Sequence, residues 1–307
     1  MCIAGAARGF STPLLLNLLK RNLFHAIGVE PRLFFLLKSL DSPKTSGSGV
    51  MVHFDQHHET SVMSIQNSLR QSWIAPAVAE AVVLEGSGDV APDVSGAPSS
   101  WSPDAPGRVV RTNDTMWRQY RSRRCERLWS GTNNEQRLIH NHLALQWCAA
   151  AIQREEARSG QRFDAVLFAR PDLLWWEPLA LPSFTSNCLW GLNSTFLRRS
   201  KSAGHDNAWV APRAHLAHLF GQATLHHDCN DDPTTAANKF ATCCLGSEQL
   251  LLYTLQTYGI PFLTIDMTYD YLRSTVDVCN FHLSSSSRIA AYFQGHAERC
   301  RRETTYL

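Results

Sequence analysis

The stretch that decides the fold reads FDAVLFARPDLLWW and spans residues 163–176. Its apolar run, Ala165 to Ala169, is typical of a short central strand in a buried sheet. Because Pro171 cannot donate a hydrogen bond to a neighbouring strand, we expect the strand to end there. Arg170 and Asp172 then emerge at the carboxyl end of a buried strand, which is the edge where open α/β sheets bind ligands.

The amino-terminal segment alternates between strand and helix patterns. Residues 1–6 predict a short buried strand, and residues 12–27 carry leucines at helical spacing. Pro13 fits the first turn of that helix, and Gly28 fits its end. A second apolar run, residues 32–37, predicts the next strand. This order opens a parallel-sheet nucleotide-binding fold, so the expected class is α/β.

The remainder of the chain continues these patterns. The expected helices span residues 61–73, 134–159, 213–221 and 247–258, and further strands span residues 81–84, 188–192 and 261–265. Residues 86–107 are rich in Gly, Pro, Ser and Asp, which predicts a flexible surface insertion. No internal repeat divides the sequence, so residues 1–307 are expected to form a single domain.

The composition is that of a globular protein. Hydrophobic residues make up 44% of the 307 residues and charged residues 18%. The formal net charge of +2 gives no strong field for nucleic acid. Charged residues and Pro31 interrupt the apolar stretch 14–40, so we expect no membrane span. Without a signal peptide the chain is expected to be cytoplasmic, or in the Golgi lumen if its amino terminus is incomplete.

The sequence contains nine cysteines but no CxxC pair and no zinc-like spacing of Cys and His. Cys125 and Cys148 fall in helical patterns, where we expect them to be buried thiols. In an oxidising compartment, one or two disulfides can form in the second half of the chain. The candidates there are Cys188, Cys229, Cys243, Cys244 and Cys279.

The tripeptide Arg170-Pro171-Asp172 carries the main chemical hypothesis. A carboxylate at a strand end can hold Mg²⁺ or Mn²⁺ together with phosphate oxygens. A guanidinium can bind a phosphate or a carboxylate in bidentate fashion. The alternative is a structural ion pair between Arg170 and Asp172.

The turn after the first strand is a second candidate. Gly5 and Gly9 allow a nucleotide to approach the backbone closely, and Arg8 can meet its phosphates or base. The absence of GxGxxG and GxxxxGK[ST] from the sequence disfavours a dinucleotide site and a P-loop. An ordinary tight turn is the alternative.

Polar and aromatic side chains further along suggest an acceptor site. Asp206 and Asn207 lead from a Gly-containing loop toward a helix. Asp206 can bind an acceptor hydroxyl or a metal, or it can cap that helix. Glu248 can act as a general base, or simply stabilise a helix amino terminus. Trp175 and Trp176 can stack on a sugar or fill the core, and we expect one of the two rings to be exposed.

Several of these residues together resemble a known group of proteins. The motif is a Cys-bearing helix, Glu155-Glu156, Gly160, Phe163-Asp164, a strand, and Arg170-Pro171-Asp172-Leu173. It resembles GT-A-type glycosyltransferase-like proteins of plants, algae and bacteria, which are poorly characterised. Weaker resemblances are seen at Cys2-Ile3-Ala4-Gly5 with Arg8, at Asp206-Asn207, and at Ser247-Glu248-Gln249-Leu250-Leu251.

The resemblance implies a GT-A-like fold, with a mixed, mainly parallel sheet flanked by helices. It also implies a nucleotide-sugar donor and a hydroxyl acceptor on a glycan, protein or lipid. The implied donor residues are Gly5, Arg8, Arg170 and Asp172, with Asp172 also the ligand for Mn²⁺ or Mg²⁺. The resemblance implies Asp206 and Glu248 as the acidic residues of the acceptor side, which orient or deprotonate the acceptor. The acceptor-binding residues expected beside them are Trp175, Trp176 and Asn207.

One departure from this pattern keeps two other functions open. Arg170 stands where a two-acid DxD motif would have its first acid. A non-catalytic nucleotide- or glycan-binding protein on the same fold is therefore the alternative. Sulfotransfer is a third hypothesis, and the lack of a Gly/Lys/Ser-Thr phosphate loop argues against it.

Overall fold

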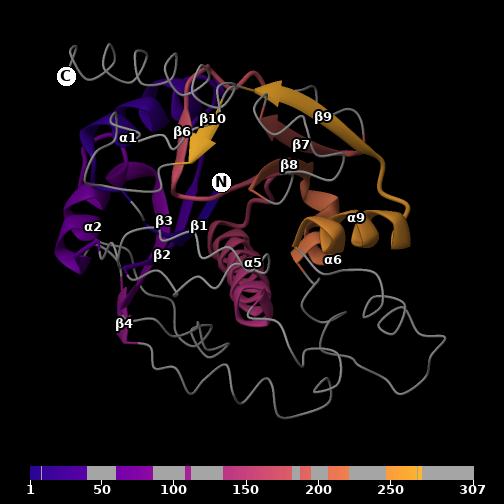
Figure 1. The fold of residues 1–307 in the computed structure, drawn as a ribbon, viewed down its shortest axis with the longest axis horizontal. Coiled ribbons are helices and arrows are strands. Elements are labelled where there is room, and N and C mark those ends of the chain that lie inside the picture. The colour runs from indigo at the N-terminus through magenta and orange to yellow at the C-terminus, as the bar shows by residue number, and fades with distance from the viewer. Residues whose placement is uncertain are drawn as a thin grey trace, which may run out of the picture.

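The computed structural model describes residues 1–7, 9–39, 60–85, 108–111, 134–181, 187–194, 207–220, 247–267 and 269–271. These residues form a mixed, mostly parallel sheet with helices on both faces (Figure 1). The predicted α/β class is confirmed. The insertion expected at residues 86–107 lies outside the described residues.

The sheet has eight strands. In order across the sheet they are β4 (Arg108–Arg111), β3 (Val78–Glu85), β2 (Leu33–Lys38), β1 (Cys2–Ala6), β5 (Ala165–Ala169), β8 (Ala208–Pro212), β7 (Leu189–Ser194) and β9 (Phe262–Met267). Strand β8 is antiparallel to its neighbours β5 and β7, and every other neighbouring pair is parallel. The carboxyl ends of seven strands and the amino end of β8 therefore share one edge, which we call the carboxyl edge.

The order of the strands reverses beside β1. From β1 the chain proceeds outward through β2, β3 and β4, and β5 then pairs with the other side of β1. In open α/β sheets this reversal is a topological switch point, and ligands bind outside the carboxyl ends of the strands there. The β1–β5 junction is therefore where the fold itself favours a binding site.

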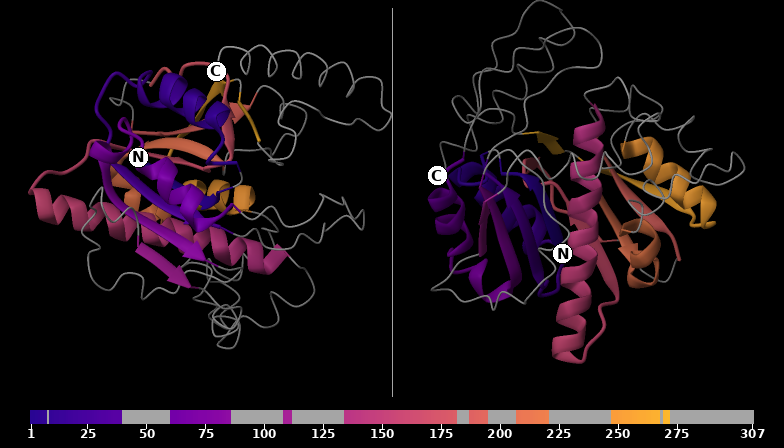
Figure 2. Two further views of the ribbon diagram at one scale, coloured as in Figure 1. Left: turned by 90° about the vertical axis from the view of Figure 1, so that its left-hand side faces the viewer. Right: turned by 90° about the horizontal axis from the view of Figure 1, so that it is seen from below.

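Two hydrophobic cores hold the helices against the sheet. One face carries α1 (Pro13–Leu18), η1 (Leu19–Phe24) and α2 (Val62–Leu69), and the other carries α5 (Asn134–Ser159), α6 (Leu216–Phe220) and α9 (Ser247–Thr257). Successive side chains of a strand point to opposite faces. Accordingly, Ile3 joins the first core, while Cys2 and Ala4 join the second. Figure 2 shows α5 running alongside the sheet.

Local signals predicted several elements well. Helix α5 and strand β5 have the predicted bounds, and Gly160 ends α5 with a φ of 68°. Thr12 caps α1 by accepting a hydrogen bond from the Leu15 amide, with Pro13 in the first turn. None of the helices in the described ranges is long and apolar enough to cross a membrane.

Other elements differ from the predictions. Strand β3 begins at Val78 and is longer than the predicted residues 81–84, and β4 and β8 were not predicted. The first helix is α-helical to Leu18 and continues as the π-helix η1. The helix expected from residue 213 is a 3₁₀ turn, η4 (Arg213–His215), followed by α6. A short strand outside the main sheet, β6 (Leu173–Trp175), pairs with β10 (Tyr269–Tyr271).

The end of α5 is fixed by ion pairs at the edge opposite the carboxyl edge. Glu155 accepts hydrogen bonds from Arg32, which precedes β2, and from Arg158. Glu156 accepts from Arg213, which follows β8, and from the amide of Phe163. Glu155 and Glu156 belong to the motif described above. Through these bonds they join α5 to the amino ends of β2 and β5 and to the end of β8.

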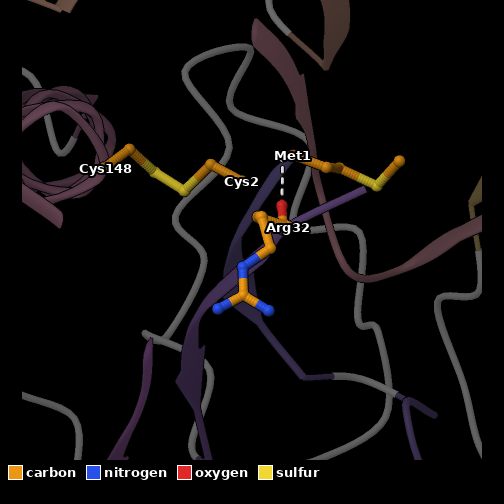
Figure 3. Close-up of a disulfide and its surroundings, with 4 residues drawn as sticks. All are labelled: Met1, Cys2, Arg32 and Cys148. Carbon is orange, nitrogen blue, oxygen red and sulfur yellow. Dashed lines mark hydrogen bonds between the residues drawn. A yellow bond between two sulfur atoms is a disulfide. The ribbon is translucent and has the colours of Figure 1, made fainter. Parts of the chain in front are cut away.

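A disulfide joins Cys2 of β1 to Cys148 of α5, with a Cα–Cα distance of 6.0 Å (Figure 3). Both cysteines are fully buried, in the core between the sheet and α5. The prediction that Cys148 is buried is confirmed, but its assignment as a thiol is wrong. The bond spans 146 positions of sequence, so no local pattern could have paired these residues.

Candidate functional site

Gly5 and Pro171 are in contact at the switch point. The β1–β5 register aligns Cys2 with Phe168 and Ile3 with Ala169, so the residues after β5 run beside the end of β1. Gly5 has a φ of 141°, and a Cβ there would lie 3.2 Å from Cδ of Pro171. A side chain at position 5 would therefore meet both backbone strain and a crowded neighbour.

Arg170 and Asp172 form a bidentate ion pair beside that contact. Nε of Arg170 donates to Oδ1 of Asp172 at 2.9 Å, and Nη2 donates to Oδ2 at 2.7 Å. The Asp172 side chain is completely buried, whereas 19% of the Arg170 side chain is exposed. Arg170 is therefore the member of the pair whose side chain is in part accessible to solvent.

Strand β8 brings Asn207 to the same place. Ala169 of β5 pairs with Ala208 of β8, and the Asn207 carbonyl accepts a hydrogen bond from the Arg170 amide at 2.9 Å. Asn207 itself is buried. Since the element that follows is a strand, the hypothesis that Asp206 caps a helix is wrong. Asp206 lies outside the described residues.

The two tryptophans after Asp172 do not face a ligand. Trp175 and Trp176 are 0% and 3% exposed and belong to the core beneath α1 and η1. The side-chain amide of Asn22, in η1, donates to the Trp175 carbonyl at 2.6 Å. The expectation of one exposed ring is wrong, because β6 turns away from the carboxyl edge and packs against this helix. Their assignment to acceptor binding therefore has no open ring face to support it.

The remaining predicted residues are placed only in part. Arg8 lies outside the described residues. Glu248 is in the first turn of α9, as the sequence predicted, and its backbone alone is described. The structure thus brings together Gly5, Arg170, Asp172 and Asn207 from the predicted set.

The end of β2 adds polar residues that the sequence reasoning missed. Lys38 and Ser39 are both buried, and the Lys38 carbonyl accepts a hydrogen bond from the Ala7 amide at the end of β1. The Ser39 hydroxyl has no hydrogen-bond partner within the described residues. The signal was present, because a Lys-Ser pair directly follows the apolar run of β2.

The described residues do not fit a Mn²⁺ or Mg²⁺ site at Asp172. Asp172 is completely buried and both of its oxygens accept hydrogen bonds from Arg170, so a divalent ion there would lie against a positively charged guanidinium. Among the described residues, no group of three His, Cys, Asp or Glu is arranged to hold a metal. No step of a reaction is therefore assigned to a metal at this carboxylate.

Comparison with known proteins adds no family to this geometry. No protein-family model matches the chain, and no curated protein matches it. What the switch point can bind therefore follows from its own residues. These are a guanidinium held by a buried carboxylate, a glycine packed against the proline between them, and polar residues at the end of β2.

Proposed function

We propose that this chain is a GT-A-like glycosyltransferase that moves a sugar from a nucleotide-sugar donor to a hydroxyl of a glycan, protein or lipid. The observation that supports it is the meeting of Gly5 with Arg170-Pro171-Asp172 at the switch point of the sheet. Ligands of open α/β sheets bind at such points. The mixed, mainly parallel sheet between two helical layers is also compatible with a GT-A-like fold.

The donor side of the proposal rests on charge and on backbone geometry. A nucleotide-sugar carries a diphosphate, and a guanidinium binds phosphate oxygens with directed hydrogen bonds. Arg170 offers this group at the carboxyl edge. The proposal assigns Arg8 the same role. Lys38 ends the neighbouring strand β2 and Ser39 follows it, so two buried polar residues lie at the same edge of the sheet.

The proposed reaction is a displacement at the anomeric carbon. The bond between sugar C1 and the diphosphate oxygen breaks, the acceptor hydroxyl oxygen bonds to C1, and the nucleoside diphosphate leaves. The hydroxyl proton passes to a carboxylate, for which Asp206 and Glu248 are the proposed bases. Arg170 balances the charge that develops on the leaving diphosphate.

A binding experiment on a matched pair of double variants tests this proposal. Arg170→Met with Asp172→Leu removes both charges, and such neutral replacements of buried pairs often leave a protein folded. Glu80→Leu with Arg154→Met is the control, because that bidentate pair joins β3 to α5 away from the carboxyl edge. Thermal unfolding is then followed with a panel of UDP- and GDP-sugars.

We expect a nucleotide-sugar to stabilise the wild type and the control variant but not the site variant. A ligand at a hundred times its Kd adds about 2.7 kcal/mol of stability, which is readily seen. If no nucleotide-sugar stabilises the wild type, or if one stabilises both variants equally, the donor site is not at Arg170.

A non-catalytic binding protein on the same fold is the second candidate. The ion pair that occupies both oxygens of Asp172 favours it, because this carboxylate is then not open to a metal. The two candidates differ in turnover. Release of nucleoside diphosphate when acceptors are added supports the transferase, and tight donor binding without release supports the binding protein.

A further inference from the structure

We propose that Asp172 is a positioning residue that holds the Arg170 guanidinium in place, and that this guanidinium rather than a divalent cation binds the donor diphosphate. This inference rests on the proposed function, because it names the group that recognises the diphosphate. It reverses the roles that a strand-end carboxylate suggests, in which the acid holds a metal and the arginine assists.

The burial of the two side chains indicates which residue binds the diphosphate and which one positions the binding residue. Asp172 is completely buried, and both oxygens of its carboxylate accept hydrogen bonds from the guanidinium. A carboxylate in such a place is stable only while an opposite charge and hydrogen bonds compensate it. Arg170 supplies both through two parallel N–H···O contacts and still exposes 19% of its side chain. The buried carboxylate therefore orients the guanidinium of a partly exposed arginine.

The backbone around the pair is fixed at three further points. The Arg170 amide donates to the Asn207 carbonyl, which anchors it to the start of β8. Pro171 packs against Gly5 of β1. After the pair, the Trp175 carbonyl accepts from the Asn22 side chain at 2.6 Å. A guanidinium held in this way loses little conformational freedom when it binds an anion, which is the general benefit of a preorganised site.

The first experiment compares binding with and without metal on the wild-type chain. Calorimetry measures the Kd of inorganic pyrophosphate, UDP and GDP, in EDTA and again in Mn²⁺. We expect at least one of these diphosphates to bind in EDTA, with an affinity within about threefold of that in Mn²⁺, a difference of less than 1 kcal/mol. Binding that appears only with Mn²⁺ overturns this inference and leaves the proposed function standing.

The second experiment uses two conservative variants. Arg170→Lys keeps the positive charge but loses the planar fork, so we expect the Kd of the bound diphosphate to rise about tenfold or more. Asp172→Asn keeps the size of the side chain but not its charge, and we expect a smaller rise that Mn²⁺ does not reverse. Glu80→Gln, in the remote ion pair with Arg154, should leave the Kd unchanged.

A positioning role also predicts coupling between the two variants. If Asp172 acts through Arg170, Asp172→Asn should have little further effect on the Kd once Arg170 is Lys. Additive effects contradict the positioning role. If Asp172→Asn fails to fold, the comparison of EDTA with Mn²⁺ still decides the question. If neither pyrophosphate nor a nucleotide binds the wild type in any buffer, the proposed function fails as well.

Discussion

Arg170 and Asp172 differ in burial, since only the Asp172 side chain is completely buried. This difference predicts how substitutions of the pair change stability. Arg170→Met leaves a fully buried carboxylate without the compensating charge of Arg170, so we expect a loss of about 3–5 kcal/mol in the free energy of unfolding. Adding Asp172→Leu should recover most of that loss, because the buried charge is then gone. Chemical denaturation of the single and double variants measures both changes. A single variant as stable as the wild type would show that the pair is not structural.

Gly5 makes a second prediction at this scale. Its φ of 141° and the 3.2 Å approach to Pro171 both oppose a side chain, so we expect Gly5→Ala to cost about 2–4 kcal/mol. Gly160→Ala is the control, because Gly160 has a positive φ but no atom within 4 Å of its Cβ position. It should cost only about 1–2 kcal/mol, from backbone strain. Denaturation curves of both variants make the comparison, and equal losses would show that the contact with Pro171 does not matter.

Glu156 makes the stability of the chain depend on pH. Burial acts to raise the pKa of this carboxyl, but hydrogen bonds from Arg213 and the Phe163 amide outweigh it and hold the pKa below its ordinary value of 4.5. A carboxyl with a depressed pKa stabilises the fold above its unfolded pKa, and the effect is lost as pH falls through the folded pKa. The relevant window therefore begins near pH 4.5 and extends downward.

The substitution Glu156→Gln tests this window. At about pH 7 we expect a loss of about 1–3 kcal/mol, because charged hydrogen bonds to Arg213 are weakened. As pH falls below 4.5 the difference in unfolding free energy from the wild type should shrink, because the wild-type carboxyl is itself protonated as pH passes its lowered pKa. Urea denaturation at both pH values measures it. If the difference in unfolding free energy between wild type and variant were the same at both pH values, the charge of the Glu156 carboxylate would not contribute to stability.

At the scale of elements, local sequence signals predicted the helices and strands whose ends they determine. They did not predict elements that depend on distant contacts. Helix α5 and strand β5 were predicted with correct bounds, since periodicity, Gly160 and Pro171 all lie in the local sequence. Strand β8 was missed because its pairing with β5 and β7 depends on distant residues. The change from α1 to the π-helix η1 was also missed. It accompanies contacts from Asn22 to Trp175 and Leu179, more than 150 positions away.

The disulfide that joins β1 to α5 makes a prediction about stability at this scale. Closing a loop of 146 positions, Cys2–Cys148 should stabilise the fold by up to about 5 kcal/mol in the chain-entropy account. We therefore expect dithiothreitol to lower the melting temperature of the wild type. The double variant Cys2→Ala with Cys148→Ala should melt lower and respond less to the reductant. Mass spectrometry of unreduced peptides checks the pairing, and a Cys2 that is found unpaired would contradict it.

At the scale of the whole molecule, the sheet assembles the candidate site from distant parts of the sequence. Strand-end reasoning placed Arg170 at the carboxyl edge, where the structure packs Pro171 against Gly5 and joins the Arg170 amide to the Asn207 carbonyl. It failed for Trp175 and Trp176, because the direction of the chain after Asp172 is set by packing on α1 and η1. For Arg170 and Asp172 the sequence left open a ligand site or an ion pair between the two side chains. The ion pair is seen only in the side-chain geometry.

The disulfide between Cys2 and Cys148 also determines whether the fragments of a proteolytic cut stay covalently linked. It makes a covalent ring of everything between those two positions. A protease that cuts once inside the ring produces two pieces that stay attached, so the nicked chain runs as one band on a non-reducing gel and as two after a thiol is added. A cut after residue 148 lies outside this ring, so the Cys2–Cys148 bond does not hold its two pieces together. Pieces that stay attached until a thiol is added therefore identify cuts inside the ring wherever this bond is the link.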